Sequence, residues 1–272
     1  MEKSSKQFSH KISLGQNFLT NPRVGELCIS SGEITGKDVI LEIGPGQGAL
    51  TRLLLESGAA FVHAIEIDTR LAEWLAPLET EFRQKFRLTW CDALASDLAA
   101  LSPHPNKVMA NIPYNITSEL IWKILSELAP HGLDRLILLV QKEAADRLAA
   151  PPCTKERCPL GITIELMGGL KTLMKVSPGS FSPPPKVWSS LIMIETKRNA
   201  SLAQNAEWRA MLKSAFSQRR KKLMNNMMKN GCPREILAET FAENGIREDA
   251  RAEELTCGQW LALYDAVRDL RA

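Results

Sequence analysis

The stretch DVILEIGPGQGALTRLLLESG, residues 38–58, decides the fold of this 272-residue chain. It begins with the apolar, β-branched run DVILEIG, which has the length and composition of a buried strand. Glycines follow at alternate positions, Gly44, Gly46 and Gly48, and leucines at helical spacing lead from there to Gly58. The stretch therefore predicts a strand, a glycine turn and a helix that Gly58 ends.

The alternation of strand and helix continues along the chain. Thr69 is expected to cap a helix over TRLAEWLAPLE, and a second helix is predicted over TSELIWKILSEL, between the last two of the strands below. A proline-rich crossing divides LKTLMKVSPGSFSPPPKVWSSLIMIETK (170–197) into two further strands that form an antiparallel hairpin. The remaining strands are predicted in AFVHAIEID (60–68), KFRLTWCDAL (85–94), KVMANIPY (107–114) and DRLILLVQ (134–141).

These elements predict an α/β, Rossmann-like domain with a mostly parallel seven-stranded sheet covered on both faces. Beyond Asn199 no strand-like run remains, and AEWRAMLKSAFSQRRKKLMNNMMK, REILAETFAENG and TCGQWLALYDAVRDL carry helical periodicity. We therefore place a boundary near residue 200. Residues 1–199 form the predicted catalytic domain, and residues 200–272 form a small all-helical C-terminal domain.

Composition indicates an ordinary globular protein, with 44% hydrophobic and 24% charged residues. No apolar run approaches the roughly 20 residues of a membrane span, and no secretory signal begins the chain, so a cytoplasmic protein without a membrane partner is expected. The six cysteines form no Cys-x-x-Cys pair. Reduced thiols and no metal site are predicted, with Cys153 and Cys158, the closest pair, in a surface loop.

The glycine turn and two acidic residues outline a binding pocket. The Gly-x-Gly-x-x-Gly spacing of dinucleotide sites is absent, and Pro45 fills one gap. Glu66, at the end of the second strand, suits both ribose hydroxyls of a nucleoside. Asp92, at the end of the third, could receive the exocyclic amine of adenine. The set predicts a pocket for an adenosine without a polyphosphate, which favours S-adenosylmethionine over ATP or NAD.

The fourth strand ends in Asn111-Ile112-Pro113-Tyr114, beside that pocket. The motif resembles that of methyltransferases acting on the exocyclic amine of adenine, although Asn and Pro are also common in strand-ending turns. The resemblance implies that the Asn111 oxygen and the Pro113 carbonyl accept the two amine hydrogens. It also implies that Tyr114 stacks on a flipped base.

The wider sequence is similar to the ribosomal RNA adenine dimethyltransferases, which dimethylate two adjacent adenosines in a small-subunit rRNA hairpin. GQNFL (15–19), LEIGPGQGALT, NIPYNIT, LLVQKEAADRL, FSPPPKVWSS and AFSQRRKKLMNN carry the resemblance. It implies that Asn17, Leu19, Gly44, Gly46 and Asn111 bind the cofactor. One segment departs from the family pattern, because ERCPLGITIEL carries Cys158, Pro159 and Gly161 where a tyrosine and a glycine are usual.

Phe181 lies in the proline-rich loop of FSPPPKVWSS. The resemblance implies that its ring forms the second aromatic wall around the target base. The alternative from the sequence alone is that the ring anchors the loop to the core.

The net charge of +3 is unevenly distributed, because residues 208–234 carry eight basic side chains and no acid. Such a segment is either a solvated helix face or a contact for an anionic polymer. We predict that a basic helix over SAFSQRRKKLMNN contacts rRNA phosphates through Arg219, Arg220, Lys221 and Lys222, supported by Lys3, Lys6 and Lys11.

The expected function is dimethylation of adenosine N6 atoms in the 16S rRNA 3′-terminal hairpin by a monomer, within a pre-small-subunit particle and during ribosome biogenesis. Two alternatives stay open at this point. One is a large-subunit rRNA adenine methyltransferase that confers macrolide resistance. The other is a non-catalytic assembly or transcription factor that keeps the cofactor fold for binding.

Overall fold

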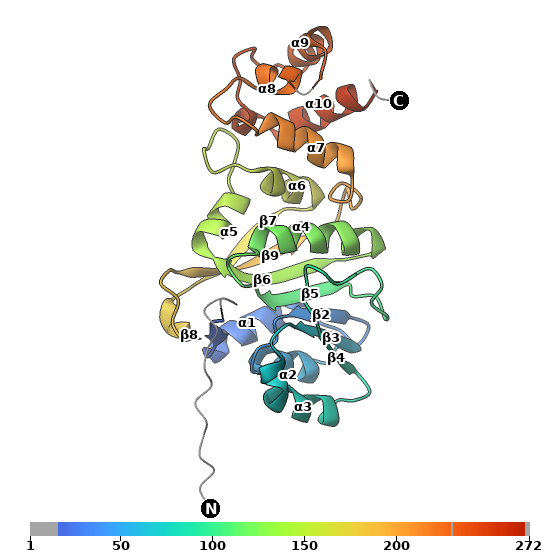
Figure 1. Cartoon of the computed structure of the whole chain (residues 1–272), viewed down its shortest axis with the longest axis vertical. Helices are drawn as coiled ribbons and strands as arrows, with labels where there is room; N and C mark the ends of the chain where they lie inside the picture. Colours follow the sequence, from blue (N-terminus) through green and yellow to red (C-terminus); the bar gives the residue numbers. More distant parts are fainter. Residues whose placement is uncertain (1–15, 230, 270–272) are drawn as a thin grey trace, which may run out of the picture.

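The computed structural model describes residues 16–229 and 231–269 (Figure 1). Lys3, Lys6, Lys11 and the first residue of GQNFL lie outside the described residues. A seven-stranded sheet occupies the middle of the chain, in the order β4-β3-β2-β5-β6-β9-β7. Its strands are β2 (Val39–Ile43), β3 (Phe61–Glu66), β4 (Phe86–Trp90), β5 (Lys107–Asn111), β6 (Arg135–Gln141), β7 (Leu170–Val176) and β9 (Ser189–Glu195).

The sheet is mostly parallel, as predicted. β2 to β6 pair in parallel, whereas β9 runs antiparallel to both β6 and β7. The carboxyl ends of the parallel strands therefore meet at one edge of the sheet, where ligands bind in such folds. β9 begins at the same edge, because its first residue, Ser189, pairs with Gln141 at the end of β6.

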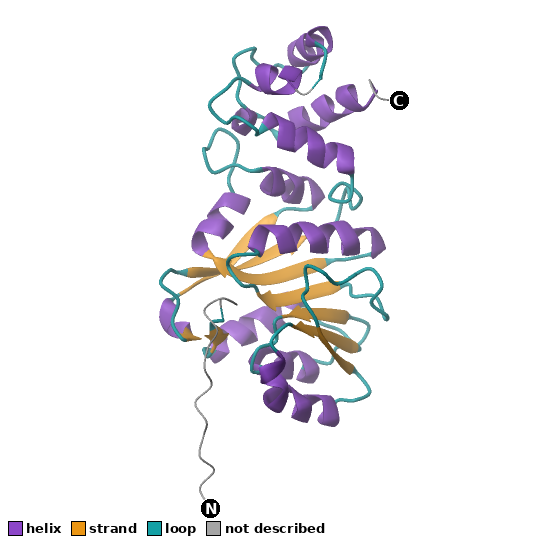
Figure 2. Cartoon of the chain, viewed as in Figure 1, coloured by secondary structure: helices purple, strands orange, loops and turns teal. Residues whose placement is uncertain are grey.

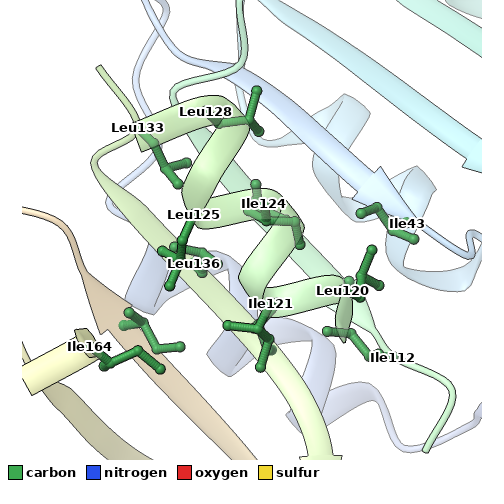
Figure 3. Packing of buried hydrophobic residues seen from close by; sticks show 14 of the residues in the cluster. Ile43, Ile112, Leu120, Ile121, Ile124, Leu125, Leu128, Leu133, Leu136 and Ile164 are labelled. Carbon is green, nitrogen blue, oxygen red and sulfur yellow. The ribbon is translucent and has the colours of Figure 1, made fainter. Parts of the chain in front are cut away.

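Helices cover both faces of the sheet (Figure 2). On one face α1 (Pro22–Gly32), α2 (Ala49–Glu56) and α3 (Ala72–Glu81) pack against the strands. The other face carries α4 (Thr117–Leu128), α5 (Lys142–Leu148) and α6 (Pro159–Met167). Figure 3 shows the α4 leucines and isoleucines lying against Ile43, Ile112 and Leu136. A continuous apolar layer thus fixes α4, and with it the loop from β5 that precedes it.

The turn after β2 has the backbone that its glycines predict. Gly44, Gly46 and Gly48 have φ of +71°, +59° and +82°, which residues with a Cβ rarely adopt. A Cβ on Gly46 would also lie 2.8 Å from the Phe18 ring. The turn therefore needs glycine for both conformation and space.

The cap predicted for the helix after β3 was wrong by one residue. Asp68, not Thr69, accepts a hydrogen bond from the Arg70 N–H through its side chain, and Thr69 is already the first residue of a 3₁₀ turn, Thr69–Leu71, that leads into α3. A carboxylate in extended backbone suits an N-cap, whereas Thr69 is already helical.

A two-stranded sheet that the sequence did not predict joins the start of the described chain to the proline-rich loop. β1 (Phe18–Leu19) pairs antiparallel with β8 (Phe181–Ser182), with Leu19 opposite Phe181. The Thr20 N–H also donates to the Ser180 carbonyl at 2.9 Å. These bonds hold the Asn17–Phe18 segment beside the sheet edge.

The C-terminal helices α7 (Ala206–Ala215), α8 (Leu223–Lys229), α9 (Arg234–Glu243) and α10 (Cys257–Asp269) gather at one end of the molecule (Figure 1). Trp208 and Trp260 are fully buried in their core. α6 contributes to both cores, because Ile162 packs with the C-terminal helices and Ile164 packs under the sheet. The predicted boundary near residue 200 therefore lies next to a helix that the two cores share.

The predicted basic helix is not continuous. α7 ends at Ala215, and Arg219 to Lys222 form a turn before α8. The buried Asn226 amide donates to the carbonyls of Ala215 and Gln218 at 2.7 and 3.1 Å. These bonds satisfy carbonyls that a continuing helix would have used itself, so the chain turns although its periodicity is helical.

None of the six cysteines forms a disulfide bond. Within the described ranges there is no group of three side chains suited to holding a metal ion. Among those same residues, no helix has both the length and the apolar character needed to cross a membrane.

Candidate active site

A cavity of about 230 Å³ opens at the carboxyl edge of the sheet, where β2, β3 and β5 end. The parallel register brings these strand ends together, with Ile43 of β2 opposite Ile65 of β3 and Ala110 of β5. Most of the predicted site residues line the cavity: Asn17, Gly44, Gly46, Glu66, Asp92, Asn111, Pro113 and Tyr114.

Glu66 is the buried acid of the cavity, with 6% of its surface exposed. Its Oε2 accepts the Gly46 N–H at 3.1 Å, and its Oε1 accepts the Asp68 N–H at 2.9 Å. Burial raises the pKa of this carboxyl, and the backbone hydrogen bonds oppose the rise. Each oxygen keeps further acceptor capacity. Glu66 can therefore receive a pair of hydroxyl donors.

Asp92 and a group of apolar side chains form another wall. The Asp92 Oδ1 accepts the Leu94 N–H at 2.9 Å, and the side chain is exposed toward the cavity. Ile67, 51% exposed, lines the cavity together with Leu94 and Ile112. The sequence reasoning missed these apolar residues, although Ile67 directly follows Glu66 at the strand end. They provide apolar contacts for an aromatic ring.

The lining fits an adenosine that carries no polyphosphate. Carboxylates lie at Glu66 and Asp92, apolar side chains line the same cavity, and the glycine turn lets a ligand approach the backbone. No lysine or arginine is among the cavity-lining residues that the structure describes. A polyphosphate would lack cationic partners, so the donor and acceptor set matches S-adenosylmethionine better than ATP.

Asn111, the last residue of β5, is held in one orientation. Its Nδ2 donates to the main-chain carbonyl of Asn17 at 2.8 Å. Because that bond uses the amide nitrogen, the oxygen Oδ1 is the atom of the carboxamide left to accept a hydrogen bond. Asn17 takes part in this contact through its main-chain carbonyl.

Tyr114 is half-buried, and its hydroxyl lies 2.8 Å from the Ser189 Oγ at the start of β9. Burial raises the pKa of the phenol, so its hydroxyl stays neutral near pH 7. The bond to Ser189 fixes the ring at the cavity wall. The Pro113 carbonyl lies in the turn that precedes α4, where Ile116 N–H and Thr117 Oγ1 donate to it at 3.3 and 3.4 Å.

Two of the residues predicted for catalysis or cofactor binding do not line the cavity within the described part of the chain. Phe181 is 4% exposed and packs in the core with Val24 and Leu191. Leu19 packs against the same core. Phe181 therefore anchors the proline-rich loop to the core, which is the alternative that the sequence left open. Through the β1–β8 pair it supports Phe18, which does line the cavity.

Behind the glycine turn lies a second buried carboxyl, Glu42, which is 1% exposed. Burial, with the charge of Glu66, raises its pKa to about 8, and Thr51 acts in the opposite direction. Glu42 does not line the cavity, and its raised pKa favours the protonated form at pH 7.

The four basic residues predicted to bind RNA have different surroundings. The Arg219 guanidinium donates to the main-chain carbonyls of Lys155 and Arg157. It also lies 5.6 Å from the centre of the Phe216 ring. Arg220, Lys221 and Lys222 are exposed beside it. Arg219 therefore ties the turn to the atypical segment before α6, and the other three point their charge to solvent.

Comparisons with known proteins match nearly the whole chain, including the cavity and the C-terminal helices. A family model described as "Ribosomal RNA adenine dimethylase" matches residues 7–269. The chain is 39% identical to "Ribosomal RNA small subunit methyltransferase A" of Rubrobacter xylanophilus over 257 residues, covering 94% of this chain and 95% of the relative. It is 38% identical to the protein of the same name from Thermosynechococcus vestitus, covering 94% and 96%.

Solved structures agree at the level of fold. A dimethyladenosine transferase from Plasmodium falciparum superposes with a TM-score of 0.77 at 26% identity, covering 90% of this chain and 95% of that one. The 23S rRNA methyltransferase ErmE gives a TM-score of 0.69 at 22% identity over 93% of this chain and all of that one, which shows a shared fold alone.

Proposed function

This chain belongs to the ribosomal RNA adenine dimethylase family of class I methyltransferases, and we propose that it dimethylates the N6 atoms of two adjacent adenosines in the 3′-terminal hairpin of small-subunit rRNA. The observation that carries the proposal is the Asn111 carboxamide, held through its Nδ2 by the Asn17 carbonyl, in a cavity that Glu66 and Tyr114 also line.

The bound cofactor, S-adenosylmethionine, supplies an electrophilic methyl group. The amine of adenine is a poor nucleophile because its lone pair is delocalised into the ring. Asn111 Oδ1 accepts one amine hydrogen and thereby draws the nitrogen toward tetrahedral geometry. The Pro113 carbonyl is the proposed second acceptor. Holding the nitrogen in line with the methyl group supplies most of the rate through orientation.

Tyr114 holds the extruded base by stacking. The negative face of its ring also favours the positive charge that develops on the attacking nitrogen. No strong base is required, because the methylated nitrogen becomes acidic and loses its proton to solvent. A mechanism without a strong base is consistent with the neutral side chains of Asn111 and Tyr114.

Cofactor binding is assigned to the rest of the cavity. Glu66 is proposed to hold the ribose hydroxyls, Asp92 the adenine amine, and the turn at Gly44 and Gly46 the methionyl part. Leu19 and Phe181 are proposed to support this wall from behind. The substrate is proposed to be rRNA within a pre-small-subunit particle, met by a monomer in the cytoplasm.

Relatives at 36–39% identity favour this reading over a large-subunit enzyme, because they are named as small-subunit methyltransferases. An intact Asn-Ile-Pro-Tyr motif argues against a factor that only binds the cofactor.

The test is incubation with labelled S-adenosylmethionine and either unmethylated small subunits or unmethylated large subunits, followed by nucleoside analysis and mapping. We expect N6-dimethyladenosine at two adjacent positions of small-subunit rRNA. Label only in large-subunit rRNA, or no label in either particle, would refute the proposal.

A further inference from the structure

Exposed apolar surface gathers near the cavity. Among the described residues, four large apolar side chains are exposed, namely Ile67, Val187, Trp188 and Met228. Ile67 lines the cavity, and Val187 and Trp188 are neighbours just before β9. An exposed tryptophan beside a binding edge calls for an explanation, since its burial would stabilise the fold.

We propose that Trp188, with Val187, forms a stacking platform for the nucleotide next to the target adenosine, an inference that rests on the proposed function. Trp188 is 52% exposed and Val187 45%. The platform lies at the carboxyl edge of the sheet, because β9 starts there opposite the last residue of β6, Gln141.

The distance to the catalytic carboxamide suits a neighbouring nucleotide. β6 separates β9 from β5, which ends in Asn111. Asn111 pairs with Leu139 and Leu139 with Leu191, so Leu191 lies two strand spacings, about 10 Å, to the side of Asn111. Trp188 precedes Leu191 by three residues, about 10 Å along the strand, so the platform is about 14 Å from Asn111. A base adjoining an extruded adenine can reach across that interval.

The platform is held rigid from both sides. The Trp188 carbonyl accepts the Lys142 N–H at 2.9 Å, and the next residue, Ser189, makes the 2.8 Å hydroxyl contact with Tyr114. Three prolines, residues 183–185, precede it. A preorganised aromatic surface loses little conformational entropy on binding. The Tyr114 contact also links the platform to the ring proposed to stack the target base.

Charges around the platform favour RNA over an apolar protein partner. Lys186 is exposed next to Val187, and exposed Lys175 of β7 pairs with Ser190. On α5, Lys142 is paired with Asp146 at 2.5 Å, and Glu143 is exposed. An aromatic side chain flanked by free lysines is the combination that binds single-stranded nucleic acid, through stacking and phosphate contacts.

The first experiment compares methyl transfer to unmethylated small subunits by the parent, Trp188→Ala, Trp188→Phe and Met228→Ala. Met228→Ala is the matched control, since it removes an exposed apolar side chain from α8. Loss of one stacked base should raise KM about 5- to 150-fold in Trp188→Ala. Trp188→Phe should keep most of the affinity, and Met228→Ala and all cofactor affinities should match the parent.

The second experiment measures binding of a 3′-terminal hairpin RNA that carries either a base or an abasic site next to the target adenosine. The abasic site should weaken binding by the parent and leave Trp188→Ala nearly unaffected. Equal sensitivity of the two proteins would overturn the platform and would assign any KM effect to a protein of the particle. The platform would also be overturned if Trp188→Ala had the KM of the parent, or if it lost cofactor affinity to the same extent as RNA affinity. The proposed function fails separately, if the parent itself labels no small-subunit rRNA.

Discussion

Asn111 and Arg220 are both assigned to RNA chemistry, yet they stand in contrasting surroundings. Asn111 ends a buried strand, is hydrogen-bonded to Asn17 and faces a cavity with a defined set of partners. Arg220 lies in an exposed turn between two helices. The contrast teaches that catalytic geometry depends on fixed main-chain positions, whereas phosphate contacts need only charge within reach.

The largest effect on activity is expected at Asn111, the residue held in a fixed position. Asn111→Ala removes the acceptor and should lower kcat about 10³-fold, as for the loss of a preorganised polar group at a reacting centre. Cofactor affinity, measured by calorimetry, should change much less. Asn225→Ala, an exposed asparagine on α8, is the control. A kcat within tenfold of the parent would break the assignment of Asn111.

Tyr114 separates stacking from positioning. Tyr114→Ala should lower kcat/KM up to about 100-fold through lost stacking. Tyr114→Phe keeps the ring and loses only the contact with Ser189, which is expected to cost about 2- to 10-fold. Ser189→Ala should reproduce the Tyr114→Phe result, and combining the two should add nothing further. Equal losses in Tyr114→Phe and Tyr114→Ala would contradict a stacking role.

The contribution of the basic turn to particle binding should depend on salt concentration. Changing Arg220, Lys221 and Lys222 together to alanine should weaken particle binding about tenfold at roughly 0.1 M salt. It should also reduce the slope of log K against log salt by about 2 to 3. Filter binding over a salt series measures both.

Arg219→Ala is the counterpart within the same turn. Because its guanidinium bonds two main-chain carbonyls, the substitution should lower the free energy of unfolding by about 1 kcal/mol and alter the salt slope less than the triple change does. Identical salt slopes for the two proteins would show that the four side chains act alike.

A further effect, on stability and not on activity, is expected at the buried carboxyl behind the cavity. Glu42 has a pKa of about 8 in the folded chain, against an ordinary value of 4.5. Between those values the folded state keeps a proton that the unfolded state releases, so stability falls as pH rises, by at most about 1.4 kcal/mol per pH unit.

Glu42→Gln, which stays neutral, should therefore gain stability relative to the parent as pH rises from 5 to 8. Urea unfolding at the two pH values measures the difference. Glu119→Gln, an exposed change on α4, should leave the pH slope as it is. An unchanged slope in Glu42→Gln would mean that Glu42 is ionised in the folded chain.

Much of the site follows from local sequence. An apolar strand, a glycine turn and a leucine-rich helix together predict one local structure. Parallel pairing then brings Glu66, Asp92 and Asn111 to one edge of the sheet, independently of loop conformation. The chemistry was predicted from the resemblance of the Asn-Ile-Pro-Tyr motif to that of methyltransferases acting on the adenine amine.

Tertiary structure decided what local pattern cannot encode. Phe181 is buried because β8 pairs with β1, a contact between segments more than 160 residues apart. The predicted basic helix breaks because Asn226, at its own end, folds back to bind the carbonyls of Ala215 and Gln218. Arg219 binds the Arg157 carbonyl, 62 residues earlier in the chain, which helical periodicity does not predict. Periodicity records which face of an element is apolar, whereas the choice of hydrogen-bond partner depends on which segments packing brings together.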